Sequence, residues 1–152
     1  MPPIRQRRIV GAVLKVPLDK RWHTYAQTLH EADFAFFDAR TTGELAVEEI
    51  VSQPVLFREA VNRSAYSAGR WLRIGKAPLS PALALPVPKF IEDALHPGRF
   101  EIYLGGKIRP AKREECVGLQ RCAVWGPERI EERLRDHYAG VPNKWVDAVR
   151  LR

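Results

Sequence analysis

The chain has 152 residues, a length that fits one ordinary domain with room for a hydrophobic core. Hydrophobic residues make up 45% of it and charged residues 28%, which is the balance of a globular protein. The net charge of +7, from 25 basic and 18 acidic residues, points to an acidic partner, either a nucleic acid or an acidic protein surface, and does not choose between them.

Membrane insertion and secretion are not expected. No apolar run approaches the roughly 18 residues that a membrane-spanning helix needs. Charges at Lys15, Asp19 and Lys20 interrupt the segment in which the apolar part of a signal peptide would lie. Two cysteines are too few for a secreted disulfide scaffold, so we expect a cytoplasmic protein.

Alternating hydrophobicity predicts strands through the first half of the chain. Residues 1–8 are basic and are expected to be a flexible N-terminal segment, followed by one domain over residues 9–152. Within the period-two strand over 22–29, Trp22 and His23 point to opposite sides. The predicted strands are residues 10–16, 22–29, 34–37, 55–61 and 71–75, with a short helix near 45–50.

The second half begins with a proline-rich connection, residues 76–88, where regular helix is not expected. Gly105 and Gly106 predict a tight hairpin between strands 100–104 and 107–109, and a short strand follows at 123–125. The period then changes to that of a helix, which begins near Pro127 and stops at Gly140, and a last short helix covers 144–149. The predicted fold class is mostly β (α+β): a curled antiparallel sheet or small barrel with C-terminal helices.

The residues that could carry chemistry do not form a recognisable catalytic or metal-binding pattern. Cys116 and Cys122 have five residues between them and no second pair, so we interpret them as two thiols rather than a zinc site. The four histidines are scattered, and no serine lies in a nucleophile elbow. We therefore expect no catalytic residue, no cofactor and no metal.

Basic residues gather after the predicted hairpin, and tryptophans lie beside arginines elsewhere in the chain. Aromatic and arginine side chains dominate the energy of many protein interfaces, and mixed basic and aromatic surfaces also bind nucleic acid. The predicted partner-binding residues are Trp22, His23, Arg70, Lys107, Arg109, Lys112 and Arg113.

The order of segments resembles the immunity protein 26 family of bacterial polymorphic toxin systems. The resemblance spans nearly the whole chain. It is carried by residues 13–18, a strand containing Tyr25, residues 36–38, 54–57, 71–75, 114–119, 123–127 and 130–134. The sequence departs from the family in its first turn, where Asp19, Lys20 and Arg21 include no glycine, and at Ala12, where the family usually has aspartate.

The resemblance implies a small β-rich protein that binds a toxin encoded beside it and neutralises it without covalent chemistry. It brings no catalytic residue or cofactor. The basic charge would then meet an acidic surface of the toxin and speed association. The alternative from the residues themselves is a small nucleic-acid-binding β-barrel, which would also suit the charge of +7.

Overall fold

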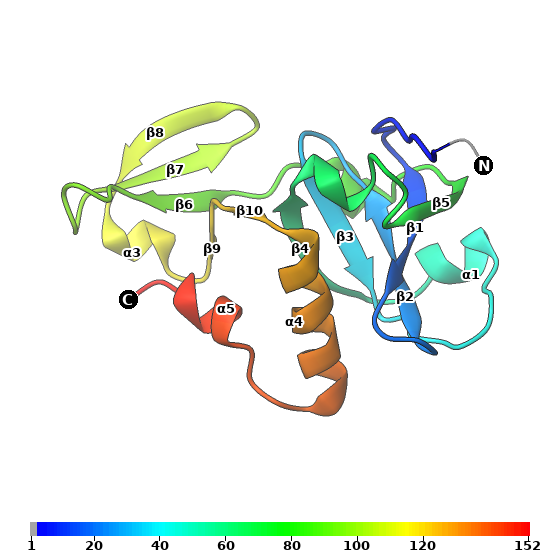
Figure 1. Ribbon diagram of the computed structural model, residues 1–152. Coiled ribbons are helices and arrows are strands. Elements are labelled where there is room, and N and C mark those ends of the chain that lie inside the picture. Colours follow the sequence, from blue (N-terminus) through cyan, green and yellow to red (C-terminus); the bar gives the residue numbers. More distant parts are fainter. Residues whose placement is uncertain (1–2) are drawn as a thin grey trace. The chain divides into compact units, whose positions relative to one another are not determined.

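A computed structural model describes residues 3–152 of the chain (Figure 1). These residues form two compact units. The first unit consists of residues 3–84 and Val124–Pro142, and the second of Leu85–Ala123 and Asn143–Arg152. The single domain predicted over residues 9–152 stays a prediction.

A six-stranded sheet forms the centre of the first unit, with the strand order β10-β4-β3-β2-β1-β5. Neighbouring strands are antiparallel, except that β10 runs parallel to β4. The strands are β1 (Ala12–Pro17), β2 (His23–Thr28), β3 (Asp33–Phe37), β4 (Val55–Val61), β5 (Leu72–Lys76) and β10 (Val124–Trp125). The three predicted strands over 10–16, 22–29 and 34–37 thus correspond to β1, β2 and β3, which pair in sequence order as a meander, and the predicted strand over 55–61 coincides with β4.

Both faces of this sheet are covered, which explains why β2 and β3 are buried along their whole length. On one face, Tyr25 and Phe37 belong to a core that Ile50 of helix α1 (Val47–Val51) and Leu83 of helix α2 (Pro81–Ala84) complete. On the other face, Trp71 packs edge-on against Phe34 and Phe36 and donates a hydrogen bond to helix α4 (Pro127–Ala139). A short 3-10 turn, η1 (Arg63–Ala65), precedes Trp71.

Helix α4 begins and ends at the residues that the sequence indicates. Pro127 occupies the first turn, where its missing N–H costs nothing, and Gly140 ends the helix in the left-handed conformation with φ 72°. Ile130 and Leu134 are fully buried, as their helical spacing predicts. His137 is exposed.

The proline-rich connection contains α2, which the sequence analysis did not expect. Pro81 starts this single turn of helix, at the helical position where proline is tolerated. Leu79 and Leu83 belong to this connection and pack against the core on one face of the sheet.

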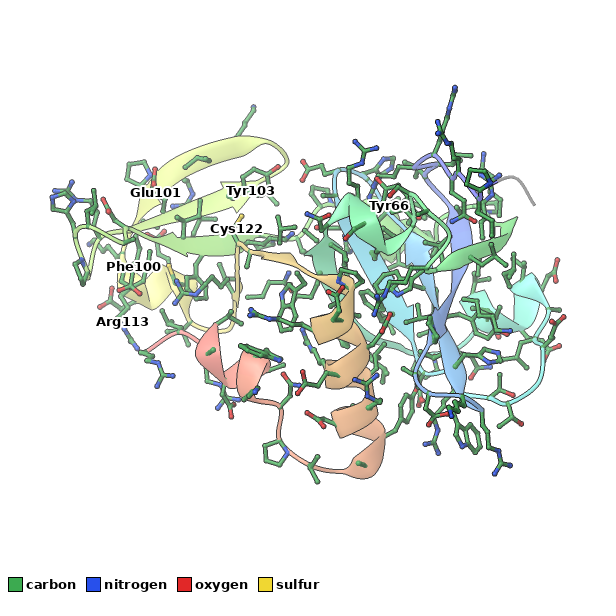
Figure 2. All side chains as sticks on the ribbon, in the orientation of Figure 1. Tyr66, Phe100, Glu101, Tyr103, Arg113 and Cys122 are labelled. Atoms are coloured by element: carbon green, nitrogen blue, oxygen red, sulfur yellow. The ribbon has the colours of Figure 1, made fainter. Side chains whose placement is uncertain are left out.

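A four-stranded sheet forms the second unit, in the order β8-β7-β6-β9, with β9 parallel to β6. The strands are β6 (Lys89–Glu92), β7 (Phe100–Leu104), β8 (Lys107–Ala111) and β9 (Gln120–Arg121), and the helices are α3 (Arg113–Cys116) and α5 (Lys144–Ala148). Phe90, Phe100, Ile102 and Cys116 form its core. Glu101 and Tyr103 lie on the opposite side of β7 from Phe100 (Figure 2).

The mostly β fold class with C-terminal helices is confirmed, and each sheet is mixed rather than purely antiparallel because of its two-residue parallel strand. Over residues 3–152, neither sheet closes into a barrel. Of the predicted flexible segment 1–8, Met1 and Pro2 lie outside the described residues, and the flexibility of the rest stays a prediction. The Gln6 side chain bonds to the backbone of Tyr66, Trp71 and Arg73, at 2.9, 2.9 and 2.8 Å.

Helix α5 depends on the side chain that begins it. The Asn143 side-chain oxygen accepts hydrogen bonds from the backbone N–H groups of Trp145 and Val146, at 3.0 and 2.9 Å. Replacing Asn143 with alanine removes this cap and is expected to lower the free energy of unfolding by about 1 kcal/mol. Urea denaturation followed by circular dichroism measures the change. Replacement with aspartate, which also accepts these bonds, is the control and is expected to keep most of the stability.

Candidate binding site

Trp22 and His23 are neighbours in the chain, and β2 begins at His23. His23 is buried, with 7% of it exposed, and its Nε2 lies 3.0 Å from the hydroxyl of Tyr25. The backbone of His23 also pairs with Thr41 in an isolated bridge. His23 is thus held inside its own unit, and Trp22 is the one of the two that faces outward, half-buried.

Burial lowers the pKa of His23, so the folded protein favours the neutral ring. The unfolded chain therefore protonates His23 more readily than the folded protein does. At high pH the ring is neutral in both states and does not affect stability. As the pH falls through the ordinary pKa near 6.5, protonation of the unfolded chain lowers the free energy of unfolding. We therefore expect the urea midpoint to fall between pH 7.5 and pH 5.5. The same comparison on His23→Gln is expected to show a smaller fall, and an equal fall would contradict the assignment to His23.

Arg70 is engaged by its own unit. Its guanidinium forms two hydrogen bonds with the carboxylate of Glu131 on α4, at 2.8 and 2.7 Å. The same carboxylate accepts the indole N–H of Trp71 at 2.8 Å. The hydrogen bond to Glu131 raises the pKa of Arg70, and Glu128 lies 3.5 Å from it. Arg70 therefore joins the loop before β5 to α4.

Trp22 belongs to an aromatic and arginine cluster, which we define as Trp22, Arg40 and Tyr138. The guanidinium carbon of Arg40 lies 4.4 Å from the centre of the Trp22 ring and 4.8 Å from that of the Tyr138 ring. Trp22 and Tyr138 are half-buried, and Arg40 is exposed. The cluster thus brings together the three residue types that contribute most often to interface energy.

The local structure around each member holds the cluster in place. The Asp19 carboxylate accepts the backbone N–H of Trp22 at 2.8 Å, which fixes the turn between β1 and β2. The Tyr138 hydroxyl donates to Oδ1 of Asp38 at 3.0 Å, and burial together with Asp38 raises the pKa of Tyr138 to about 12. The phenol therefore stays protonated at neutral pH, and the cluster is ordered before any partner arrives.

Arg40 and Tyr138 were not predicted as site residues. Their positions in the sequence gave little reason to pair them with Trp22, because Tyr138 is more than one hundred residues away. Two sequence features bring these residues near the sheet. Tyr138 lies in the last turn of an amphipathic helix that must pack on the strands, and Arg40 follows a buried strand closely. Neither fact identifies the ring that each residue meets.

The other four predicted residues gather in the second unit as a basic hairpin, which we define as Lys107, Arg109, Lys112 and Arg113. All four are exposed. The turn at Gly105 and Gly106 has φ values of 57° and 83°, which glycine adopts without strain, so the predicted tight hairpin is confirmed.

The contacts of the basic hairpin leave much of its charge at the surface. Arg109 lies 3.1 Å from Glu115, with 59% and 42% of the two side chains exposed. Arg113 Nε donates to the carbonyl of Arg152 at 2.9 Å. The second unit as a whole carries ten basic and six acidic residues. This surface can therefore attract an acidic partner over a distance of about one Debye length.

No group of three or more metal-ligating side chains is found among residues 3–152. Cys116 and Cys122 are both free, the first buried and the second exposed. Burial raises the pKa of Cys116, so its thiol stays protonated and unreactive at neutral pH. The described surfaces offer aromatic rings and positive charge, which are common means of binding another macromolecule.

Helices long and apolar enough to cross a membrane are absent from the described part of the chain. No curated protein and no solved structure matches the chain significantly. The sequence model of the family described as Immunity protein 26 matches residues 9–101, which include β1 to β6 and the start of β7. Because this match covers more than half of the chain, the protein belongs to the Immunity protein 26 family.

Proposed function

We propose that this protein binds a cognate bacterial polymorphic toxin in the cytoplasm and neutralises it by non-covalent inhibition. The observation that carries the proposal is the membership of the Immunity protein 26 family. Inhibition by binding needs a rigid scaffold with a complementary surface, and it needs no cofactor or catalytic residue. We accordingly assign the protein no enzymatic activity.

The proposed contact residues are Trp22 and the four members of the basic hairpin. His23, which the sequence also suggested, is left out because it is buried, and Arg70 is left out because two hydrogen bonds to Glu131 already occupy its guanidinium. An exposed basic hairpin supports a toxin with an acidic contact surface, since opposite charges speed the encounter of two proteins. The half-buried ring of Trp22 supports a close-packed contact that persists after the encounter.

The test is capture of the toxin under conditions that separate protein from nucleic-acid binding. The tagged chain is expressed with the toxin encoded beside it, and the lysate is treated with nuclease and washed at about 0.15 M and 1 M salt, where the screening lengths are about 8 and 3 Å. We expect the toxin to stay bound at one to one through both washes. Recovery of nucleic acid alone, lost at high salt, would instead support the nucleic-acid-binding alternative, because counterion release makes such binding strongly salt-dependent.

A further inference from the structure

The guanidinium of Arg40 is positioned by two aromatic rings and is not used by its own chain. Its side chain has no hydrogen bond or ion pair with any of residues 3–152. Two other arginines of this unit lie close to an aromatic ring, and both have such a partner: Arg133 has Glu59, and Arg8 has the carbonyl of Asp33. Arg40 is therefore an ordered cation whose N–H groups are available to a ligand.

The rings determine which ligand suits this cation. A guanidinium that lies on the faces of aromatic rings keeps its N–H donors in its own plane, pointing away from the rings. A planar fork of this kind matches a carboxylate, which it can hold by two parallel hydrogen bonds. The rings of Trp22 and Tyr138 also exclude water from one side of the guanidinium, and this strengthens its attraction to a bound carboxylate.

The charges near Arg40 favour a negative ligand. Lys20 and Arg21 are exposed in the same turn as Trp22, and Arg135 lies one helical turn before Tyr138. Asp19 and Asp38 carry negative charge close by in the chain, but neither forms an ion pair with Arg40: Asp19 accepts backbone N–H groups of its own turn, and Asp38 accepts the hydroxyl of Tyr138. These bonds lower the pKa of Asp19 and keep it committed to the turn.

We infer that Arg40 is the anchor of the toxin interface and that it binds an aspartate or glutamate carboxylate of the toxin as a two-hydrogen-bond fork. Trp22 and Tyr138 act as positioning residues that hold the fork in place. The inference rests on the proposed function and adds the contacting residue and the chemistry of the partner. A nucleic-acid phosphate is the less favoured ligand, because the guanidinium already covers one face of each ring that could otherwise stack on a base.

The test measures the affinity of the captured toxin for the wild-type chain, Arg40→Lys and Arg40→Gln by isothermal titration calorimetry. Arg63, an exposed arginine of η1 in the same unit, gives the matched controls Arg63→Lys and Arg63→Gln. We expect at least tenfold weaker binding for Arg40→Lys, which keeps the charge but loses the fork, and roughly thirtyfold or more for Arg40→Gln. The Arg63 variants should stay within about threefold of wild type.

A second measurement identifies the carboxylate. Each aspartate and glutamate of the toxin is replaced by its amide, and each variant is measured against wild type and Arg40→Lys. At the toxin position that contacts Arg40, the amide substitution and Arg40→Lys are expected to be coupled. Combined, these two substitutions should weaken binding by less than the product of their separate effects. Thermal unfolding within about 2 °C of wild type shows that the Arg40 variants are folded, as expected for an exposed side chain.

The outcomes separate the inference from the function on which it rests. A wild-type chain that binds no toxin contradicts the proposed function, and the inference falls with it. Tight binding by wild type that Arg40→Lys and Arg40→Gln leave unchanged contradicts the inference alone. A third outcome concerns nucleic acid. If a fluorescent 20-nucleotide single-stranded DNA or RNA binds the wild-type chain and does not bind Arg40→Gln, the Arg40 guanidinium binds a phosphate, and this result also contradicts the inference.

Discussion

Replacing Glu59 with alanine is expected to lower the free energy of unfolding by about 3 to 5 kcal/mol. Glu59 on β4 and Arg133 on α4 form an ion pair at 2.9 Å in which the side chains are 7% and 16% exposed. Burial lowers the pKa of Arg133, and Glu59 offsets this effect. Without the carboxylate, the guanidinium is left largely buried against the rings of Phe57 and Trp125 with no opposite charge from Glu59.

Urea denaturation followed by circular dichroism measures this loss. Glu92→Ala is the matched control, because it breaks an Arg–Glu contact of 3.7 Å whose side chains are 29% and 26% exposed, and its expected cost is about 1 kcal/mol or less. Replacing both Glu59 and Arg133 with leucine is expected to recover much of the stability by removing both buried charges. A loss for Glu59→Ala no larger than for Glu92→Ala would contradict the account of how α4, and with it Tyr138, is held on the sheet.

Reversing the charge of the basic hairpin at all four positions is expected to slow association with the toxin by roughly 10- to 100-fold at low salt. The residues are exposed and lie along β8 and at the start of α3, so their contribution is mainly to the long-range field. The dissociation rate should change much less, because the anchor proposed here lies in the other unit. Stopped-flow fluorescence at several salt concentrations measures both rates.

The control for this experiment reverses four exposed basic residues of the first unit: Arg5, Arg7, Arg63 and Arg73. Both variants have the same net charge, so a difference between them reports where the charge lies. We expect the association rates of the two variants to converge as salt rises, because screening removes the field. A hairpin variant that associates as fast as the control, or that mainly dissociates faster, would contradict the steering role.

Much of the fold could be predicted because each strand of the meander carries its own alternating pattern and is bounded by turn residues. Strand β4 follows Pro54 and the β7–β8 hairpin contains Gly105 and Gly106, and these local signals were read correctly. Strand β6 was missed because it follows Pro86 and Pro88, which suggested a continuous loop. Strand β10 lies within the strand predicted at 123–125, whereas the two-residue strand β9 was missed, since it exists through pairing with the distant strand β6 and has no period of its own.

The candidate site was predicted in part. Strand alternation predicts that Trp22 and His23 point to opposite sides, but it does not say which of the two is buried, so both were proposed as contacts. The partners of Arg70 lie about sixty residues away on α4, and those of Trp22 lie at Arg40 and Tyr138. Such contacts follow from tertiary packing, which a single sequence does not display.

Neutralisation of the toxin in living cells tests the central claim most directly. Bacteria that express the toxin encoded beside this chain are grown with the wild-type protein, with the Trp22→Ala and Arg40→Gln double variant, or with no partner. We expect full growth with wild type, severely reduced growth with the double variant at equal abundance, and none without a partner. Growth that stops equally in all three cultures would contradict the claim that this protein neutralises the toxin.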